Sequence, residues 1–269
     1  MPMKKARPII LALTVLLLFG CGAKRIERGD SAEALYQRAM DELQKKRGFP
    51  WIFTGTDYDT VLKLLKEIQL KYTFSPYATL AELRTADTYF KKGEYEQASI
   101  EYEDFIKRHP GHEQLPYATF RLGLSHYKQI RSYDRDPTNT RETIKWFDSF
   151  IEQYPDSPLK SEAEKMMEEC RERLAKREIY IGNFYASRKN HKAAVARYKV
   201  VVDQYADTKE NEEALFLLGM SYSKMGQQGL AKEALKRVIE EYPKAKYHKK
   251  AAELLSKIEE KEKREAKKG

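Results

Sequence analysis

An aromatic side chain followed by proline recurs along this chain, and this recurrence limits the possible folds more than any other feature. The pairs are His109-Pro110, Tyr154-Pro155 and Tyr242-Pro243, with Tyr72-Thr73 and Tyr205-Ala206 as degenerate copies. The second residues of successive pairs are 37, 45, 51 and 37 positions apart, and periods in this range are typical of tandem helical repeats. Apolar residues also recur at a spacing of three and four, without a strand pattern, so the sequence predicts an all-α fold.

Alignment of the repeats on these pairs brings small and aromatic residues into register. The aligned sets are Ala86, Tyr89, Ala98, Tyr102, Phe105 and Pro110; Gly182, Tyr185, Ala194, Tyr198, Val201 and Ala206; and Gly219, Tyr222, Ala231, Leu235, Val238 and Pro243. The pattern resembles that of TPR repeats, in which small residues let two helices approach closely and proline ends the second helix. We therefore predict a superhelical array of about five TPR-type helix pairs. The aromatic residues are expected in its core, not in a binding site.

The first 20 residues have the composition of a signal peptide. A basic segment, 1–7, precedes the apolar run 9–19, whose 11 residues would span only about 16 Å as a helix, roughly half of a bilayer core. The run ends in Leu-Phe-Gly-Cys, which resembles a bacterial lipobox and predicts acylation of Cys21. An ordinary signal peptide with a chance cysteine is the alternative. Gly22, where an aspartate would resemble an inner-membrane retention signal, favours the outer membrane.

Composition and charge argue against several classes of function. The net charge is +9, but acidic and basic residues alternate along the helices, which indicates solvated faces and no nucleic-acid site. The five histidines are scattered and no catalytic, phosphate-binding or metal motif is present, so we assign no catalytic residue, no metal and no cofactor. Cys170 lies in a helical pattern and is interpreted as a buried, inert thiol without a disulfide partner.

The repeats are uneven, which suggests an internal organisation. We predict a lipidated tether over 21–30, an N-terminal lobe of repeats 1–3 over 31–160, a C-terminal lobe of repeats 4–5 over 161–256 and a charged tail over 257–269. The C-terminal lobe should begin with a long linking helix. An aromatic loop at 48–55 either folds back onto the array or forms a contact surface.

Four residues are candidates for partner binding. Phe74 and Tyr77 flank a Ser-Pro turn, where an aromatic side chain could reach an extended segment of another protein. Arg135 lies between two aspartates and either stabilises its own loop or contacts a partner. Arg197 lies between the expected core residues Ala194 and Tyr198 on the second helix of its pair. Its guanidinium is expected to pair either with a carboxylate of a partner domain or with one inside the array.

Several local strings together resemble one family, the BamD (ComL or YfiO) lipoproteins. Segments 72–78, 134–138 and 154–158 are similar to that family's inter-repeat turns and to its insertion in the third repeat, and the resemblance covers almost the whole mature chain. Two departures are the aromatic loop at 48–55 and Ala206 in place of a proline. The first weakens any inference about an N-terminal substrate site.

The resemblance implies a non-enzymatic role in the assembly of outer-membrane β-barrel proteins. Such lipoproteins lie on the periplasmic side of the outer membrane and work with other assembly lipoproteins. They dock on the periplasmic domains of the barrel-forming BamA subunit and help to deliver or recognise unfolded barrel proteins. N-terminal repeats are the expected substrate side, and C-terminal repeats the expected side for BamA.

Two other classes share some of these features. A pilotin that escorts secretin subunits would have the same lipobox and repeats, but the Asp-Arg-Asp-Pro string at 134–137 and the spacing of the whole chain argue against it. An envelope enzyme built on a helical superhelix, such as a lytic transglycosylase, would need an additional catalytic domain. Only about two dozen residues follow the fifth repeat.

Overall fold

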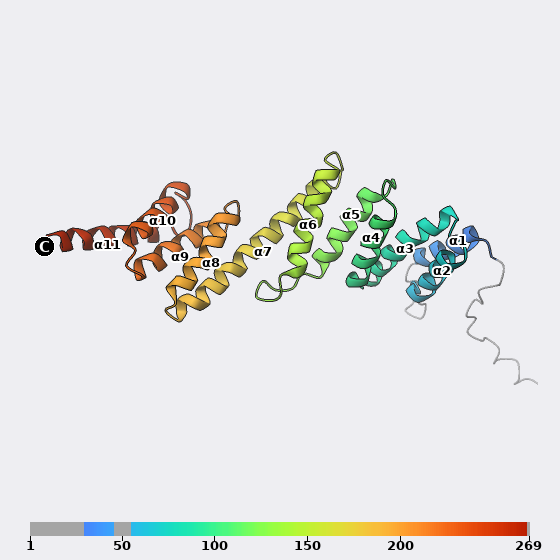
Figure 1. The fold of residues 1–269 in the computed structure, drawn as a ribbon, viewed down its shortest axis with the longest axis horizontal. Coiled ribbons are helices and arrows are strands. Elements are labelled where there is room, and N and C mark those ends of the chain that lie inside the picture. Colours follow the sequence, from blue (N-terminus) through green and yellow to red (C-terminus); the bar gives the residue numbers. More distant parts are fainter. Residues whose placement is uncertain (1–29, 46–54, 268–269) are drawn as a thin grey trace, which may run out of the picture. The chain divides into compact units, whose positions relative to one another are not determined.

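The computed structural model describes residues 30–45 and 55–267, and in these ranges it contains eleven helices and no strand (Figure 1). Cys21 and nearly all of the aromatic loop lie outside the described residues. The helices are α1 (Ala32–Gln44), α2 (Tyr58–Lys71), α3 (Pro76–Lys92), α4 (Tyr95–Arg108), α5 (Leu115–Lys128), α6 (Thr138–Gln153), α7 (Lys160–Ser187), α8 (His191–Gln204), α9 (Asn211–Lys224), α10 (Gln228–Glu241) and α11 (His248–Ala266). The predicted all-α class and the five helix pairs are confirmed, with α11 following the fifth pair.

The chain divides into two compact units, Met1–Ala78 and Thr79–Gly269. In the first unit α1 and α2 form a pair whose core includes Leu35 and Ile68, both almost completely buried. The Ser31 side chain caps α1 by accepting a hydrogen bond from the backbone N–H of Ala34. The boundary between the units does not coincide with the lobe boundary predicted near residue 160, and the division into lobes stays a prediction.

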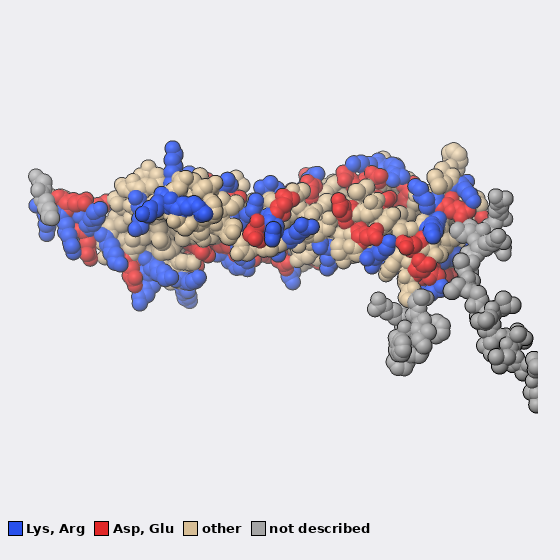
Figure 2. All heavy atoms as spheres, turned by 90° about the horizontal axis from the view of Figure 1, so that it is seen from below, with Lys and Arg blue, Asp and Glu red and all other residues tan. Residues whose placement is uncertain are grey.

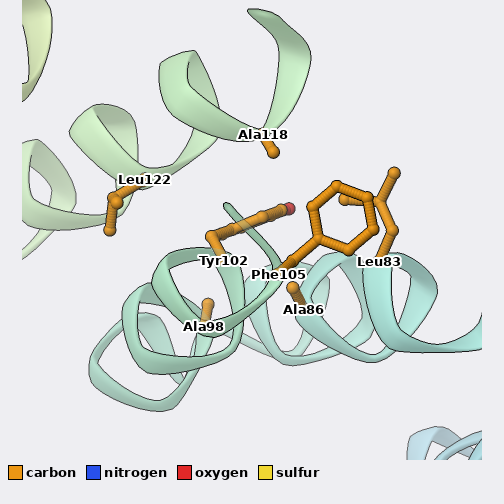
Figure 3. Packing of buried hydrophobic residues seen from close by; sticks show 7 residues of the cluster. All are labelled: Leu83, Ala86, Ala98, Tyr102, Phe105, Ala118 and Leu122. Carbon is orange, nitrogen blue, oxygen red and sulfur yellow. The ribbon is translucent and has the colours of Figure 1, made fainter. Parts of the chain in front are cut away.

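In the second unit, α3, α4 and α5 enclose the side chains that the repeat pattern places in the core (Figure 3). Tyr102 and Phe105 of α4 have no exposed surface and lie among small residues of the neighbouring helices. The cluster consists of Leu83, Ala86, Ala98, Tyr102, Phe105, Ala118 and Leu122. Burial of these apolar side chains is the main favourable contribution to the packing of the three helices.

Small residues lie where two helices of a pair approach each other, as the sequence predicts. A Cβ atom on Gly182 would lie 2.3 Å from Cε1 of Tyr198, and one on Gly219 would lie 2.8 Å from Cγ of Leu235. These distances are shorter than any normal van der Waals contact, so glycine is required at both positions for this helix separation.

The aromatic pairs of the sequence end helices. The residue immediately after α4 is His109, and the residues after α6, α8 and α10 are Tyr154, Tyr205 and Tyr242. Helix α8 also ends before Tyr205, although alanine takes the place of proline at position 206. The linking helix α7 is continuous over 28 residues. The last helix, α11, extends to Ala266 through most of the predicted charged tail.

Candidate protein-binding surface

Three large aromatic side chains are exposed together beside α7. Tyr180 and Phe184 lie one helical turn apart on α7 and are 49% and 48% exposed, and Tyr133, from the loop between α5 and α6, is 41% exposed. The rings of Tyr133 and Tyr180 meet edge to face with centroids 5.9 Å apart. We call these three residues the aromatic surface. Clusters of exposed aromatic groups mark interaction sites more often than single exposed side chains do.

Polar contacts hold the loop of Tyr133 against α7. The guanidinium of Arg173 donates a 2.7 Å hydrogen bond to the carbonyl of Arg131. Inside the loop, the backbone N–H of Arg135 donates to the carbonyl of Ser132 at 3.0 Å. The hydroxyl of Ser132, with weaker help from nearby arginines, lowers the pKa of Asp134 below its usual value. The insertion in the third repeat is therefore ordered around Tyr133.

Cationic groups border the aromatic surface. The guanidinium carbon of Arg188 lies 3.6 Å from the ring centroid of Phe184, a cation–π contact. Arg135, a predicted binding residue, is exposed in the same loop as Tyr133. Stacked aromatic and arginine side chains are typical of interface hot spots, because they bury large areas while keeping polar contacts.

Arg197 forms the ion pair that the sequence analysis left as one of two alternatives. Its Nη1 atom on α8 lies 3.1 Å from Oε2 of Glu178 on α7. The Arg197 side chain is 43% exposed, whereas that of Glu178 is only 13% exposed. The guanidinium therefore keeps an outward face, and its contact with a partner domain stays a prediction.

Phe74 and Tyr77 differ in their surroundings although they flank the same turn. Phe74 is fully exposed. The ring of Tyr77 lies 5.5 Å from that of Tyr36 on α1, and partial burial, with a contribution from Glu33, raises the pKa of Tyr77. Phe74 is thus the better placed of the two for contact with another protein, and both assignments stay predictions.

A buried polar cluster in the second repeat was missed by the sequence analysis. The Oδ1 atom of Asp87 accepts hydrogen bonds from the hydroxyls of Tyr102 and Tyr117, at 2.6 and 2.7 Å. Its Oδ2 atom accepts from Arg84 at 2.6 Å, and the Nε–H of Arg121 donates to the Tyr102 hydroxyl at 3.1 Å. Burial raises the pKa of Tyr117 to about 12. An aspartate directly after the small residue of the helix contact was the available signal.

Cys170 and two of the five histidines make contacts inside the helical array. Cys170 is buried, and this burial raises the pKa of its thiol to about 12, as expected for an unreactive cysteine. His109 contacts Glu82 at 2.8 Å, and His126 contacts Asn139 at 3.1 Å.

Two further observations concern metal ligands and membrane spans. In the described part of the chain, no three His, Cys, Asp or Glu side chains come together as metal ligands would. Within the same ranges, every helix is too short or too polar to span a bilayer.

The fold and its exposed surfaces define a TPR-type array of helix pairs, a class of structure that binds peptides and protein domains on extended surfaces. The sequence matches the YfiO family, described as "Outer membrane lipoprotein", over residues 28–236. The match covers most of the chain, so the protein belongs to this family.

Three relatives align over 81% to 98% of their own length. The outer membrane protein assembly factor BamD of Neisseria meningitidis serogroup A is 28% identical over 81% of this chain and 81% of its own. BamD of Neisseria gonorrhoeae is 28% identical over 88% of this chain and 90% of its own. BamD of Rickettsia prowazekii is 28% identical over 93% of this chain and 98% of its own. A solved TPR protein of Thermus thermophilus aligns over 85% and 98% of the two chains, with 15% identity and a TM-score of 0.34, too low for structural detail to be transferred.

Proposed function

We propose that this protein is a non-enzymatic scaffold for the assembly of outer-membrane β-barrel proteins. In this proposal an acylated Cys21 anchors the chain to the outer membrane, and the helical array faces the periplasm. Membership of an outer membrane lipoprotein family supports the anchor, and the names of the relatives support the assembly role. The observation that carries the proposal is the aromatic surface, because clustered exposed aromatic side chains mark protein interaction sites.

The partner on the aromatic surface is a BamA-type subunit. Tyr180 and Phe184 supply apolar contact area, and Arg188 and the outward face of Arg197 supply positive charge on the same helix pair. A periplasmic domain with apolar side chains bordered by carboxylates complements such a surface. Unfolded barrel segments bind elsewhere, near the exposed Phe74, and other assembly lipoproteins join the same complex.

A pull-down from native membranes in mild detergent tests this proposal, with the bound proteins identified by mass spectrometry. We expect a BamA-type subunit to be recovered with the wild-type chain and lost with the double variant Tyr180→Ser and Phe184→Ser. The matched control is Ile100→Ser, because Ile100 is 48% exposed on α4, a helix of the second repeat. Recovery of a secretin or a cell-wall protein in place of the BamA-type subunit would overturn the assignment and favour the pilotin alternative.

The lipid anchor is tested separately. Mass spectrometry of the N-terminal peptide should show acyl groups on Cys21, and Cys21→Ser should release the protein from the membrane fraction. An unmodified Cys21 in a chain that remains in the membrane fraction would contradict this part of the proposal.

A further inference from the structure

A groove with an apolar floor and a lysine-rich rim lies between α9 and α11. Its volume is about 570 Å³. The α11 side chains that line it recur at a spacing of three and four residues and so form one helical face, as do those of α9. The lining residues are Phe216, Met220, Ser223, Lys224, Gln228, Lys250, Glu253, Leu254, Lys257, Ile258 and Lys261. We call this cavity the C-terminal groove.

The floor of the C-terminal groove is anchored in the core. Phe216 and Ile258 are less than 10% exposed and belong to the apolar cluster of the last repeat. The ring of Phe216 also stacks on that of Tyr247, with centroids 5.0 Å apart. Met220, at 36% exposure, presents a flexible thioether to the groove. Methionine adapts to differently shaped apolar partners, so this floor can receive side chains from another chain.

The rim of the groove is positively charged. Lys224, Lys250, Lys257 and Lys261 face a single acid, Glu253. Among the described residues, no carboxylate lies within salt-bridge distance of the first three of these lysines, whereas Lys261 lies 3.7 Å from Glu265. Figure 2 shows many lysine and arginine side chains, with acidic side chains among them, near the C-terminal end of the chain on the face drawn. The groove therefore attracts negative charge.

The positive charge is distributed along the groove. Lys250 and Lys261 are 11 positions apart on α11, which corresponds to about 16 Å along the helix axis. A single phosphate group could contact only one part of this row. An elongated chain with acidic residues at intervals could contact all of it.

We propose that the C-terminal groove binds an acidic amphipathic segment of a partner protein. The segment places its apolar side chains on Phe216, Met220 and Leu254, and its carboxylates against Lys250 and Lys257. The C-terminal groove lies on α9 and α11 and shares no residue with the aromatic surface. The proposal for the groove therefore does not depend on which subunit binds the aromatic surface.

Two synthetic amphipathic peptides of 18 residues test the proposal. They share one leucine face and carry either glutamate or lysine at the polar positions. Binding of each labelled peptide is measured by fluorescence anisotropy to the full-length protein in phosphatidylcholine nanodiscs, with empty nanodiscs as the blank. We expect the glutamate peptide to bind at least tenfold more tightly than the lysine peptide, and its binding to weaken as salt concentration rises.

The decisive variant is Lys250→Glu with Lys257→Glu, and the matched control is Lys249→Glu with Lys263→Glu on exposed positions of α11 that do not line the groove. The groove variant should lose at least tenfold in affinity for the glutamate peptide, and the control less than threefold. Equal losses in both variants, or equal binding of the two peptides, would overturn the proposal. So would a groove variant that keeps peptide binding but, in a Cys21→Ser chain without the lipid anchor, no longer attaches to phosphatidylglycerol vesicles, since that result would identify a lipid site.

Discussion

The second and fourth repeats build the same helix contact with different groups. In both, a tyrosine of the second helix donates a hydrogen bond to the residue after the small contact position. Tyr102 donates to Asp87 at 2.6 Å, and Tyr198 donates to Asn183 at 2.7 Å. Asp87 is 4% exposed and charged, whereas Asn183 is neutral and exposed. The second repeat therefore depends on a buried polar cluster, while the fourth depends on the close approach at Gly182.

The same two repeats also differ on the face of their first helix. Tyr180 and Phe184 of the fourth repeat align with Arg84 and Thr88 of the second. Arg84 forms an ion pair with Asp87. Thr88 is buried, and its hydroxyl donates a hydrogen bond to the backbone carbonyl of Arg84. Polar groups of the second repeat are thus satisfied internally, whereas the fourth repeat exposes aromatic rings. This difference indicates that the first helix of the fourth repeat, and not that of the second, offers a surface to a partner protein.

The largest expected effect comes from removing the centre of the polar cluster. Asp87→Ala should lower the free energy of unfolding by about 3 kcal/mol, because two tyrosine hydroxyls and the guanidinium of Arg84 lose their shared acceptor. The matched change Asn183→Ala should cost about 1 kcal/mol. Urea denaturation followed by circular dichroism measures both. Equal losses would show that the two contacts are built alike.

The close approach in the fourth repeat can be tested by adding one methyl group. Gly182→Ala should destabilise the protein by about 2 kcal/mol, because its Cβ would overlap the Tyr198 ring. Ala86→Gly, the reverse change at the aligned position, should cost about 1 kcal/mol through backbone entropy alone. If Gly182→Ala proved neutral or stabilising in the same denaturation experiment, tight contact would not be what holds this pair.

An exposed ion pair beside the fourth repeat should matter least. Arg171 donates two hydrogen bonds to Asp207, at 2.9 and 2.6 Å, and this hydrogen bonding lowers the pKa of Asp207. Because the pKa of Asp207 is lowered on folding, its ion pair stabilises the folded state at pH values above the usual pKa of 3.8. This stabilisation is lost as pH falls through the folded-state pKa. Because Asp207 is largely exposed, Asp207→Asn should cost at most about 0.5 kcal/mol at pH 7. The cost should disappear near pH 2, and a cost that grows in acid would contradict this assignment.

The repeat pattern predicted the fold because its periodic residues act locally. The Gly182 and Tyr198 contact, the helix stops and the buried Cys170 all follow from spacing along one or two helices. The cluster around Asp87 could not be derived in the same way, because Tyr117 and Arg121 come from the next repeat and only the three-dimensional packing brings them together. The aromatic surface was likewise hidden, since Tyr133 and Tyr180 are separated by a whole helix.

The central claim is that the aromatic surface binds a BamA-type subunit. Site-specific photo-crosslinking in native membranes tests this claim most directly. A photoreactive phenylalanine analogue is placed at Phe184 or, as the control, at Ile100 in the second repeat, since both side chains are 48% exposed. The account predicts a crosslink to a BamA-type subunit from position 184 and none to that subunit from position 100. Equal crosslinking from both positions, or a different envelope protein captured at position 184, would contradict it.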